Sequence, residues 1–127
     1  MAQRAKPLSP HLQIYRFTLT MLMSISQRAT GIVQYAGTLL LVLWLLGAAI
    51  GGDFFEGVNA LFGSWFGQLV LFAYTWSLFH HALGGIRYFI WDQRKMMDPA
   101  GRELLVRLQI GGSVLLTLGA WALWVWR

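Results

Sequence analysis

The sequence predicts an all-α integral membrane protein with three transmembrane helices, and three observations lead to this class. Of its 127 residues, 57% are hydrophobic and 12% are charged, about half the charge that a soluble domain usually carries. Three apolar runs are each long enough to cross a bilayer. Seven Trp, eight Phe and four Tyr in so short a chain suit aromatic belts at the membrane surface.

The first segment, residues 1–22, reads as a polar arm. No apolar stretch follows its basic residues closely, as a signal peptide requires, and it lacks the length and the Arg- and Ser-rich composition of a transit peptide. Pro7 and Pro10 favour an extended backbone. Thr20 or Ser24 is placed to cap a helix that begins before the apolar run proper. We expect a cytoplasmic arm that the mature protein retains.

The remainder, residues 23–127, is predicted to form one transmembrane domain with spans at about 28–50, 65–90 and 106–126. Within the first apolar run, Gly31 to Ile50, the only clearly polar side chain is Gln34. The third span ends in "WALWVW", an aromatic cluster suited to the headgroup boundary.

The charged residues outside the spans predict the orientation. Basic residues gather before the first span and between the second and third, whereas the first loop carries only two acidic residues. The basic residues are Arg4, Lys6, Arg16, Arg28, Arg94, Lys95, Arg102 and Arg107, and the acidic ones are Asp53 and Glu56. By the positive-inside rule the N-terminus is cytoplasmic. The net charge of +5 therefore reflects orientation in a lipid bilayer, and we expect no nucleic-acid partner.

The second span contains three polar residues that a bilayer disfavours: His80, His81 and Arg87. Arg87 lies near the predicted cytoplasmic end, where its guanidinium can reach the interface. The histidines lie deeper and need hydrogen-bond partners, which makes them candidates for a functional site. Because the chain has no Cys, a cofactor would be held through His, through charge or by packing.

Two interpretations of these histidines remain open from the residues alone. His80 and His81 point about 100° apart around a helix, so at most one binds a given metal. Gly84 and Gly85 follow His81 at i+3 and i+4 and leave room for a flat macrocycle. Alternatively, the glycines allow close helix packing and each histidine bonds a neighbouring helix.

A second polar pair, Ser24 and Arg28, opens the first span on one helix face. A hydroxyl and a guanidinium at this depth could bind a carbonyl or an acid. The alternative is a capping serine beside an ordinary juxtamembrane arginine.

A haem of the electron-transfer type needs two axial ligands. No second histidine lies on another span, and His11 belongs to the polar arm, where we expect it at the surface. If a histidine of the second span binds haem, the other ligand must come from another polypeptide, in a hetero-oligomer or a symmetric homodimer.

Three motifs together resemble one family, the large cytochrome b membrane-anchor subunit of succinate dehydrogenase (succinate:quinone oxidoreductase, respiratory complex II). They are "PLSPHLQIYR" at 7–16, "SISQRATG" at 24–31 and "HALGGIRYFIWD" at 81–92. Their order and spacing match the family over essentially the whole chain.

The resemblance implies a role for several residues. His81 matches the axial ligand of haem b, which selects it over His80. Ser24, Ile25 and Arg28 match the region that lines the ubiquinone pocket, and Arg28 and Gln27 lie where haem propionates are approached.

Two positions depart from the family pattern. Gln27 stands where a histidine is usual, and Tyr88 replaces the histidine after Gly-Ile-Arg. Gln27 can donate a hydrogen bond but carries no charge, and we make no functional claim for Tyr88.

The resemblance also implies an enzyme subunit that does not itself touch succinate. It would share one haem b with a second small membrane-anchor subunit, which supplies the other ligand. It would pass electrons from the iron–sulfur subunit, and ultimately from the flavoprotein subunit, to ubiquinone, linking the tricarboxylic acid cycle to electron transport. Alternatives are the anchor of a quinol-fumarate reductase and a haem-free structural anchor. We expect the bacterial cytoplasmic membrane; the mitochondrial inner membrane is disfavoured because no transit peptide is seen.

Overall fold

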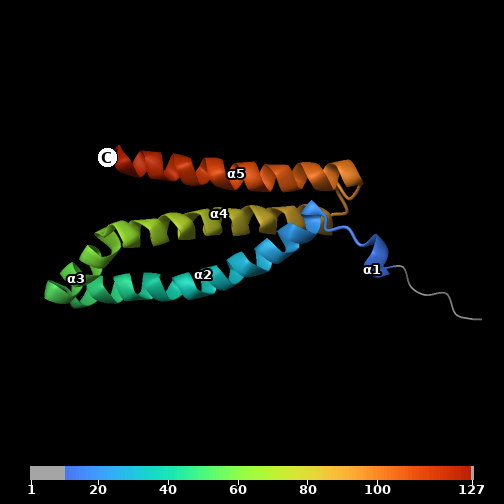
Figure 1. Cartoon of the computed structure of the whole chain (residues 1–127). Coiled ribbons are helices and arrows are strands. Elements are labelled where there is room, and N and C mark those ends of the chain that lie inside the picture. Colours follow the sequence, from blue (N-terminus) through green and yellow to red (C-terminus); the bar gives the residue numbers. More distant parts are fainter. Residues whose placement is uncertain (1–10, 127) are drawn as a thin grey trace, which may run out of the picture.

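The computed structural model describes residues 11–126, and every element in that range is a helix or a short connection. The helices are α1 (His11–Ile14), α2 (Leu19–Ile50), α3 (Gly52–Gly63), α4 (Trp65–Asp92) and α5 (Pro99–Val125). The three long helices run side by side with α4 in the middle, between α2 and α5 (Figure 1). Each is long and apolar enough to cross a membrane. The predicted class, an all-α membrane protein with three spans, is confirmed.

The first long helix begins earlier than the sequence predicted. Thr18 is the N-cap, and its hydroxyl accepts a hydrogen bond from the backbone N–H of Met21 at 3.4 Å. The expectation that Thr20 or Ser24 caps the helix is wrong, because the helix begins at Leu19 and both residues lie inside it; the Thr20 hydroxyl lies 3.0 Å from that of Thr18. With 32 residues, α2 is about 48 Å long, which exceeds the ~30 Å of a hydrocarbon core. α2 is therefore longer than a perpendicular span of the hydrocarbon core requires.

The connection between α2 and α4 is itself helical, although the sequence reading treated it as a loop. Gly51 and Gly52 adopt φ values of 72° and 58°, in the left-handed region that glycine tolerates, and the chain reverses there into α3. The Trp44 indole N–H donates to Asn59 Oδ1 at 3.2 Å and ties α3 to α2. Gly67 lets α4 pass close to the backbone of α3, because a Cβ there would overlap the carbonyl oxygen of Leu61.

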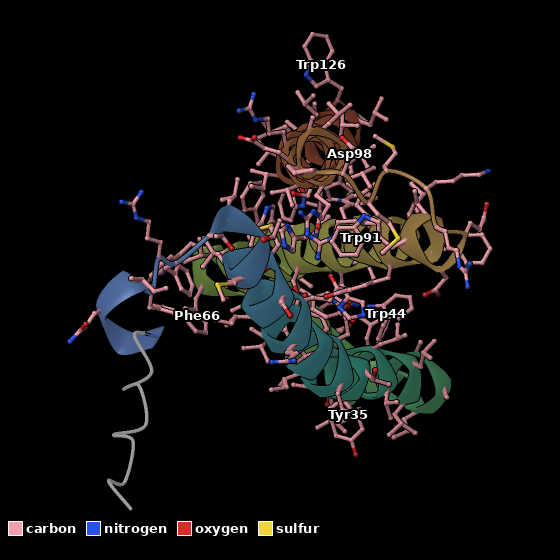
Figure 2. The ribbon with its side chains drawn as sticks, turned by 90° about the vertical axis from the view of Figure 1, so that its right-hand side faces the viewer. Tyr35, Trp44, Phe66, Trp91, Asp98 and Trp126 are labelled. Atoms are coloured by element: carbon pink, nitrogen blue, oxygen red, sulfur yellow. The ribbon has the colours of Figure 1, made fainter. Side chains whose placement is uncertain are left out.

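The interior of the bundle is mostly polar, and large apolar side chains face outward. The buried apolar residues are Met23, Val58, Leu105 and Val106, and the buried polar ones are Thr30, Ser77, His80, Arg87, Gln109, Ser113 and Thr117. Figure 2 shows Tyr35 and Trp126 pointing away from the bundle. In lipid, helices gain little from apolar burial and associate through small residues and hydrogen bonds. The distribution fits a protein whose outer surface contacts lipid or partner helices.

Two glycines bring α2 and α4 close together. A Cβ on Gly37 would overlap the ring of Tyr74, and one on Gly84 would overlap the side chain of Gln27. These contacts place the polar side chains of α2 within hydrogen-bonding distance of α4.

The turn between α4 and α5, residues 93–98, lies at the same end of the molecule as α1 (Figure 1); we call this the arm end. The Arg94 N–H donates to Trp91 O at 2.8 Å and the Lys95 N–H to Ile90 O at 3.3 Å, a Schellman closure. Arg94 stands at its left-handed position with φ 58°. Asp98 then caps α5, with Oδ2 3.0 Å from the N–H of Gly101.

Candidate functional site

His80 lies at the centre of a polar cluster that joins the three long helices. Its side chain is 2% exposed. Nε2 lies 3.0 Å from Ser26 Oγ of α2 and 3.2 Å from Gln109 Nε2 of α5, and Nδ1 lies 3.5 Å from Ser113 Oγ. Trp76 stacks on the ring, with centroids 5.0 Å apart. Because both ring nitrogens already have protein partners, His80 is placed as a structural tie between helices.

His81 points to a different side of α4 and has one nitrogen engaged. Its Nδ1 lies 3.2 Å from Thr30 Oγ1, and that hydroxyl donates to the carbonyl oxygen of Ser26 at 2.8 Å. Because the hydroxyl hydrogen is used on the carbonyl, the oxygen accepts from the imidazole and Nδ1 carries the proton. Nε2 is then the basic nitrogen, and within residues 11–126 it forms no hydrogen bond. In this arrangement the lone pair of Nε2 is not used by any hydrogen bond among the described residues.

The two glycines after His81 differ in their surroundings. Gly84 is buried against Gln27 and Gln109, where a Cβ would lie 2.7 Å from Gln109 Nε2. Gly85 has no atom within 4 Å of its Cβ position. Close helix packing therefore accounts for Gly84, whereas the surface beside Gly85 is open.

Gln27 bridges α2 and α4 beneath His81. Its Nε2 donates to the backbone carbonyl of His81 at 3.0 Å, while its Oε1 is buried with no partner among the described residues. The side chain thus helps hold the turn of α4 that carries His81. Its contact with a haem propionate stays a prediction.

Of the three residues predicted to bind quinone, Ser24 lines a cavity, whereas Ile25 and Arg28 face outward. Ser24 is half-buried and lines a cavity of about 400 Å³ at the arm end. Ile25 is 52% exposed, and Arg28 is exposed as well. Neither lines that cavity. Ser24 and Arg28 share a helix edge, as the spacing predicts, but the structure brings Ser24 together with α4 and leaves Arg28 on the open surface.

The expectation that Arg87 reaches the interface is wrong. Its side chain is 2% exposed, and its guanidinium carbon lies 5.1 Å from the Tyr88 ring centroid and 5.0 Å from that of Trp91. The start of α2 and the start of α5 cover this turn of α4, and Figure 2, which looks onto the arm end, labels Trp91 there. The sequence signal that could have pointed to this site is the pair of aromatic residues at i+1 and i+4 from the arginine.

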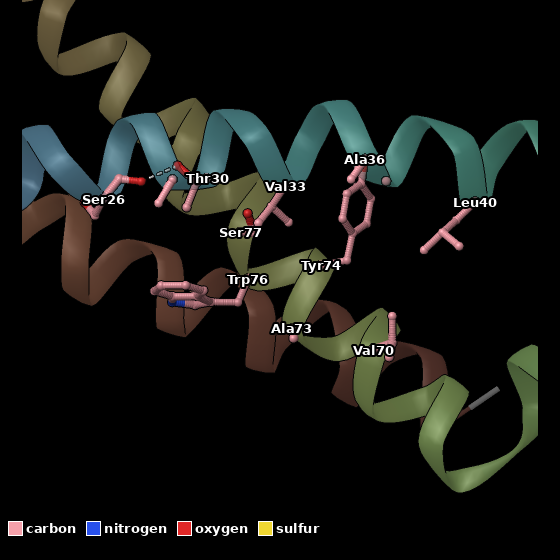
Figure 3. A pocket seen from close by; sticks show the side chains of 12 residues that line it. Ser26, Thr30, Val33, Ala36, Leu40, Val70, Ala73, Tyr74, Trp76 and Ser77 are labelled. Atoms are coloured by element: carbon pink, nitrogen blue, oxygen red, sulfur yellow. Dashed lines mark hydrogen bonds between the residues drawn. The ribbon is translucent and has the colours of Figure 1, made fainter.

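An apolar groove of about 620 Å³ separates α2 and α4 on another side (Figure 3). Small residues open it, among them Ala29, Ala36 and Ala73. Thr30 and Trp76, which contact His81 and His80, lie at one end of it (Figure 3). The groove has room for an apolar group beside His80 and His81.

Fold and site together define a class of protein: a small three-span membrane subunit with a polar interior and a half-buried histidine, His81, that has one ring nitrogen hydrogen-bonded to a neighbouring helix. The chain belongs to the family described as succinate dehydrogenase/fumarate reductase transmembrane subunit, which matches residues 2–120.

Individual relatives support this assignment. The chain is 34% identical to the succinate dehydrogenase cytochrome b556 subunit of Paracoccus denitrificans, over 89% of this chain and 87% of that one. It is 30% identical to the subunit of the same name from Rickettsia conorii, over 91% and 90% of the two chains. The mitochondrial cytochrome b560 subunit of Sus scrofa is 37% identical over 71% of this chain, which spans 54% of that relative.

These findings confirm the family that the three motifs indicated. The protein is a membrane-anchor subunit of the succinate dehydrogenase type and belongs to an oxidoreductase complex. Its bacterial relatives match along nearly their whole length, in agreement with the expected multi-pass location in the bacterial cytoplasmic membrane.

Proposed function

We propose that this chain is the cytochrome b subunit of a succinate:quinone oxidoreductase, that it binds haem b through His81, and that it forms part of the site where ubiquinone is reduced. The names of its relatives, cytochrome b556 and b560 subunits, support the general role. The residues of the chain support the specific one.

The observation that carries the haem proposal is the hydrogen bond between His81 and Thr30. Since Thr30 holds the proton on Nδ1, the Nε2 lone pair is available to iron, and a neighbour bonded to the other nitrogen orients the ring. The open surface at Gly85 leaves space next to the imidazole for a macrocycle. His81 Nε2 would therefore be the atom of this chain that holds the haem iron.

The second axial ligand would come from a partner membrane subunit. His80 has both ring nitrogens engaged and lies inside the bundle, and the side chain of His11 lies outside the described residues. In this proposal the haem would be shared between the two membrane subunits.

Haem b, when bound, supplies a one-electron redox centre whose potential depends on its ligands and burial. In this proposal the side chains of Gln27 and Arg28 would face the propionates. Arg28 is exposed and free to turn toward a group bound at the surface, whereas Gln27 would do so with its second amide hydrogen, because the first is bonded to His81 O.

The quinone would be held by Ser24, Ile25 and Arg28. The Ser24 hydroxyl would donate to a carbonyl oxygen, Ile25 would contact the ring, and Arg28 would stabilise negative charge that develops during reduction. Such donors act most strongly where water is excluded and where they are already in position. The electrons would arrive from the iron–sulfur subunit, after a flavoprotein subunit oxidises succinate.

The arm end would face the cytoplasm and contact the water-soluble subunits. The basic residues outside the spans, Arg94, Lys95, Arg102 and Arg107 among them, would meet anionic lipid or an acidic surface of the iron–sulfur subunit. The positive-inside rule supports this orientation.

The test is a dithionite-reduced minus oxidised spectrum of the purified complex. We expect a b-type signal in the wild type, its loss in His81→Ala and its retention in His80→Gln, in which an amide replaces the buried imidazole. A signal that survives in His81→Ala would refute the ligand assignment, and a wild-type complex without any signal would leave a haem-free anchor.

The reverse reaction is the second candidate, because the family description covers fumarate reductase as well. We favour succinate oxidation, since each of the relatives named above is a succinate dehydrogenase subunit. Assays of the complex in both directions, with quinone and with quinol, would distinguish them.

A further inference from the structure

Arg87 is a buried cation whose hydrogen-bonding groups lack partners. Its side chain is 2% exposed, and its Nε and Nη1 atoms have no acceptor among the described residues. Among the described residues, the one ion pair joins Arg107 to Glu103 on the surface. No carboxylate of these residues therefore forms an ion pair with Arg87. A buried donor without a partner costs about 1–3 kcal/mol. A ligand that supplies acceptor oxygens would remove this cost.

The charge of Arg87, in contrast to its N–H groups, is already compensated in part. The guanidinium lies about 5 Å from the ring centroids of both Tyr88 and Trp91, within the range of cation–π attraction. The missing partner therefore need not be an anion such as a lipid phosphate. A neutral molecule with carbonyl oxygens and a flat ring suits both the donors and the aromatic surroundings.

The cavity beside Arg87 has the lining that such a molecule needs. It is bounded by α2, by the end of α4 and by the chain that enters α5, and its volume of about 400 Å³ is within the ~300–1,000 Å³ of ligand pockets. Its lining consists of Thr20, Met21, Ser24, Arg87, Tyr88, Trp91, Met97 and Arg102. Ser24 also lines the cavity, and its hydroxyl is a second group that can donate a hydrogen bond.

We propose that Arg87 is a quinone-binding residue: its guanidinium donates to a carbonyl oxygen of a quinone headgroup seated in the cavity that it shares with Ser24. The proposal rests on the quinone site proposed above, with which this cavity shares Ser24, and adds the last turns of α4 to it; Ile25 and Arg28 lie outside the cavity. Tyr88 and Trp91 hold the guanidinium in place, and Met21 and Met97 supply soft apolar contacts to the ring.

The test uses the purified complex with a short-chain ubiquinone. We expect Arg87→Gln to raise the KM for quinone at least tenfold, while succinate oxidation by an artificial electron acceptor and the haem spectrum remain near wild type. Arg87→Lys keeps the charge but loses the planar set of N–H donors, so its KM for quinone should lie between those of the wild type and Arg87→Gln. Glu56→Gln, which removes an exposed charge from α3 at the end of the molecule away from this cavity, serves as the control.

The outcomes separate this inference from the function on which it rests. If Ser24→Ala raises the quinone KM but Arg87→Gln leaves it within twofold of wild type, Arg87 is not at the site and the proposed function stands. If neither variant changes quinone reduction, both the cavity and the quinone site are wrong.

A second measurement keeps the proposal testable if the Arg87 variants fail to assemble. An azido-quinone photolabel applied to the wild-type complex should mark the peptide containing residues 88–97, and excess ubiquinone should suppress the labelling. Labelling confined to other peptides would overturn the proposal. Suppression by anionic phospholipid vesicles, but not by ubiquinone, would reassign the cavity to a lipid headgroup.

Discussion

Thr30 and His81 face each other across the contact between α2 and α4, with Oγ1 3.2 Å from Nδ1. This pair sets the tautomer of the imidazole and its direction at the same time. The proposed iron ligand is therefore positioned by a residue of another helix that would not itself touch the haem.

Replacing Thr30 with Val keeps the shape of the side chain and removes the oxygen that accepts from Nδ1. We expect the complex to bind haem about 10–100-fold more weakly, the usual effect of losing such an outer partner. Haem content per complex and the haem midpoint potential would show the change. Thr38→Val is the control, because the Thr38 hydroxyl bonds only its own helix, at Gln34 O. Full haem content and an unchanged potential in Thr30→Val would contradict the role.

Gly84→Ala should destabilise the complex, by about 1–3 kcal/mol if the helices repack. The new methyl group would meet Gln27 and Gln109, and both amides are already bonded to backbone carbonyls of α4. The midpoint of thermal inactivation in detergent measures the effect. Gly111→Ala has no neighbour at its Cβ position and should leave the midpoint unchanged or slightly higher. Equal midpoints for the two variants would refute the close contact.

Gln109→Leu should cost about 1–3 kcal/mol, because it leaves buried polar groups around His80 without a partner. Removing both members, in His80→Phe with Gln109→Leu, should cost less than the sum of the two single changes. A double-mutant cycle on thermal stability measures this coupling. Strict additivity would show that the side-chain contact between Gln109 Nε2 and His80 Nε2, 3.2 Å apart, contributes no coupling energy.

Arg94→Gly should stabilise the protein by up to about 1 kcal/mol. Arg94 has φ 58°, a conformation that costs an L-residue about 1–2 kcal/mol and that glycine adopts freely. Gln93→Gly is the matched control: Gln93 has φ −82°, so glycine there gains nothing and adds freedom to the unfolded chain. Chemical denaturation of the purified complex compares the two, and a loss of stability in Arg94→Gly would overturn the expectation.

The spans could be predicted from the sequence because the length and apolarity of a segment are local properties. The helix at Gly52–Gly63 could not be recognised in the same way: Asp53 and Glu56 suggested a polar loop. Its apolar side chains, Phe55 and Val58 among them, find their contacts only when the chain folds back against Gly47 of α2.

The site residues likewise divide into features that the local sequence predicted and features that depend on contacts with distant parts of the chain. The spacing of His80 and His81 predicted that they point different ways, and the structure agrees. His80 has both ring nitrogens engaged because of its contacts with Gln109 and Ser113, which lie 29 and 33 residues further along the chain. No local sequence pattern predicts those contacts. The prediction for the Arg87 side chain was wrong for a related reason, because its burial depends on the residue at which α2 begins.

The cluster around His80 bears on how the chain enters the membrane during synthesis. α4 is the least apolar of the three candidate spans and carries His80 and Arg87, so its release from the translocon into lipid alone is the costliest of the three insertions. Ser26, in α2, is made before His80, but Gln109 and Ser113 follow only with α5. A nascent chain that stopped before α5 would hold a half-satisfied imidazole in lipid. α4 should therefore remain beside the insertion machinery until α5 has been synthesised, and the last two spans should leave it as a pair.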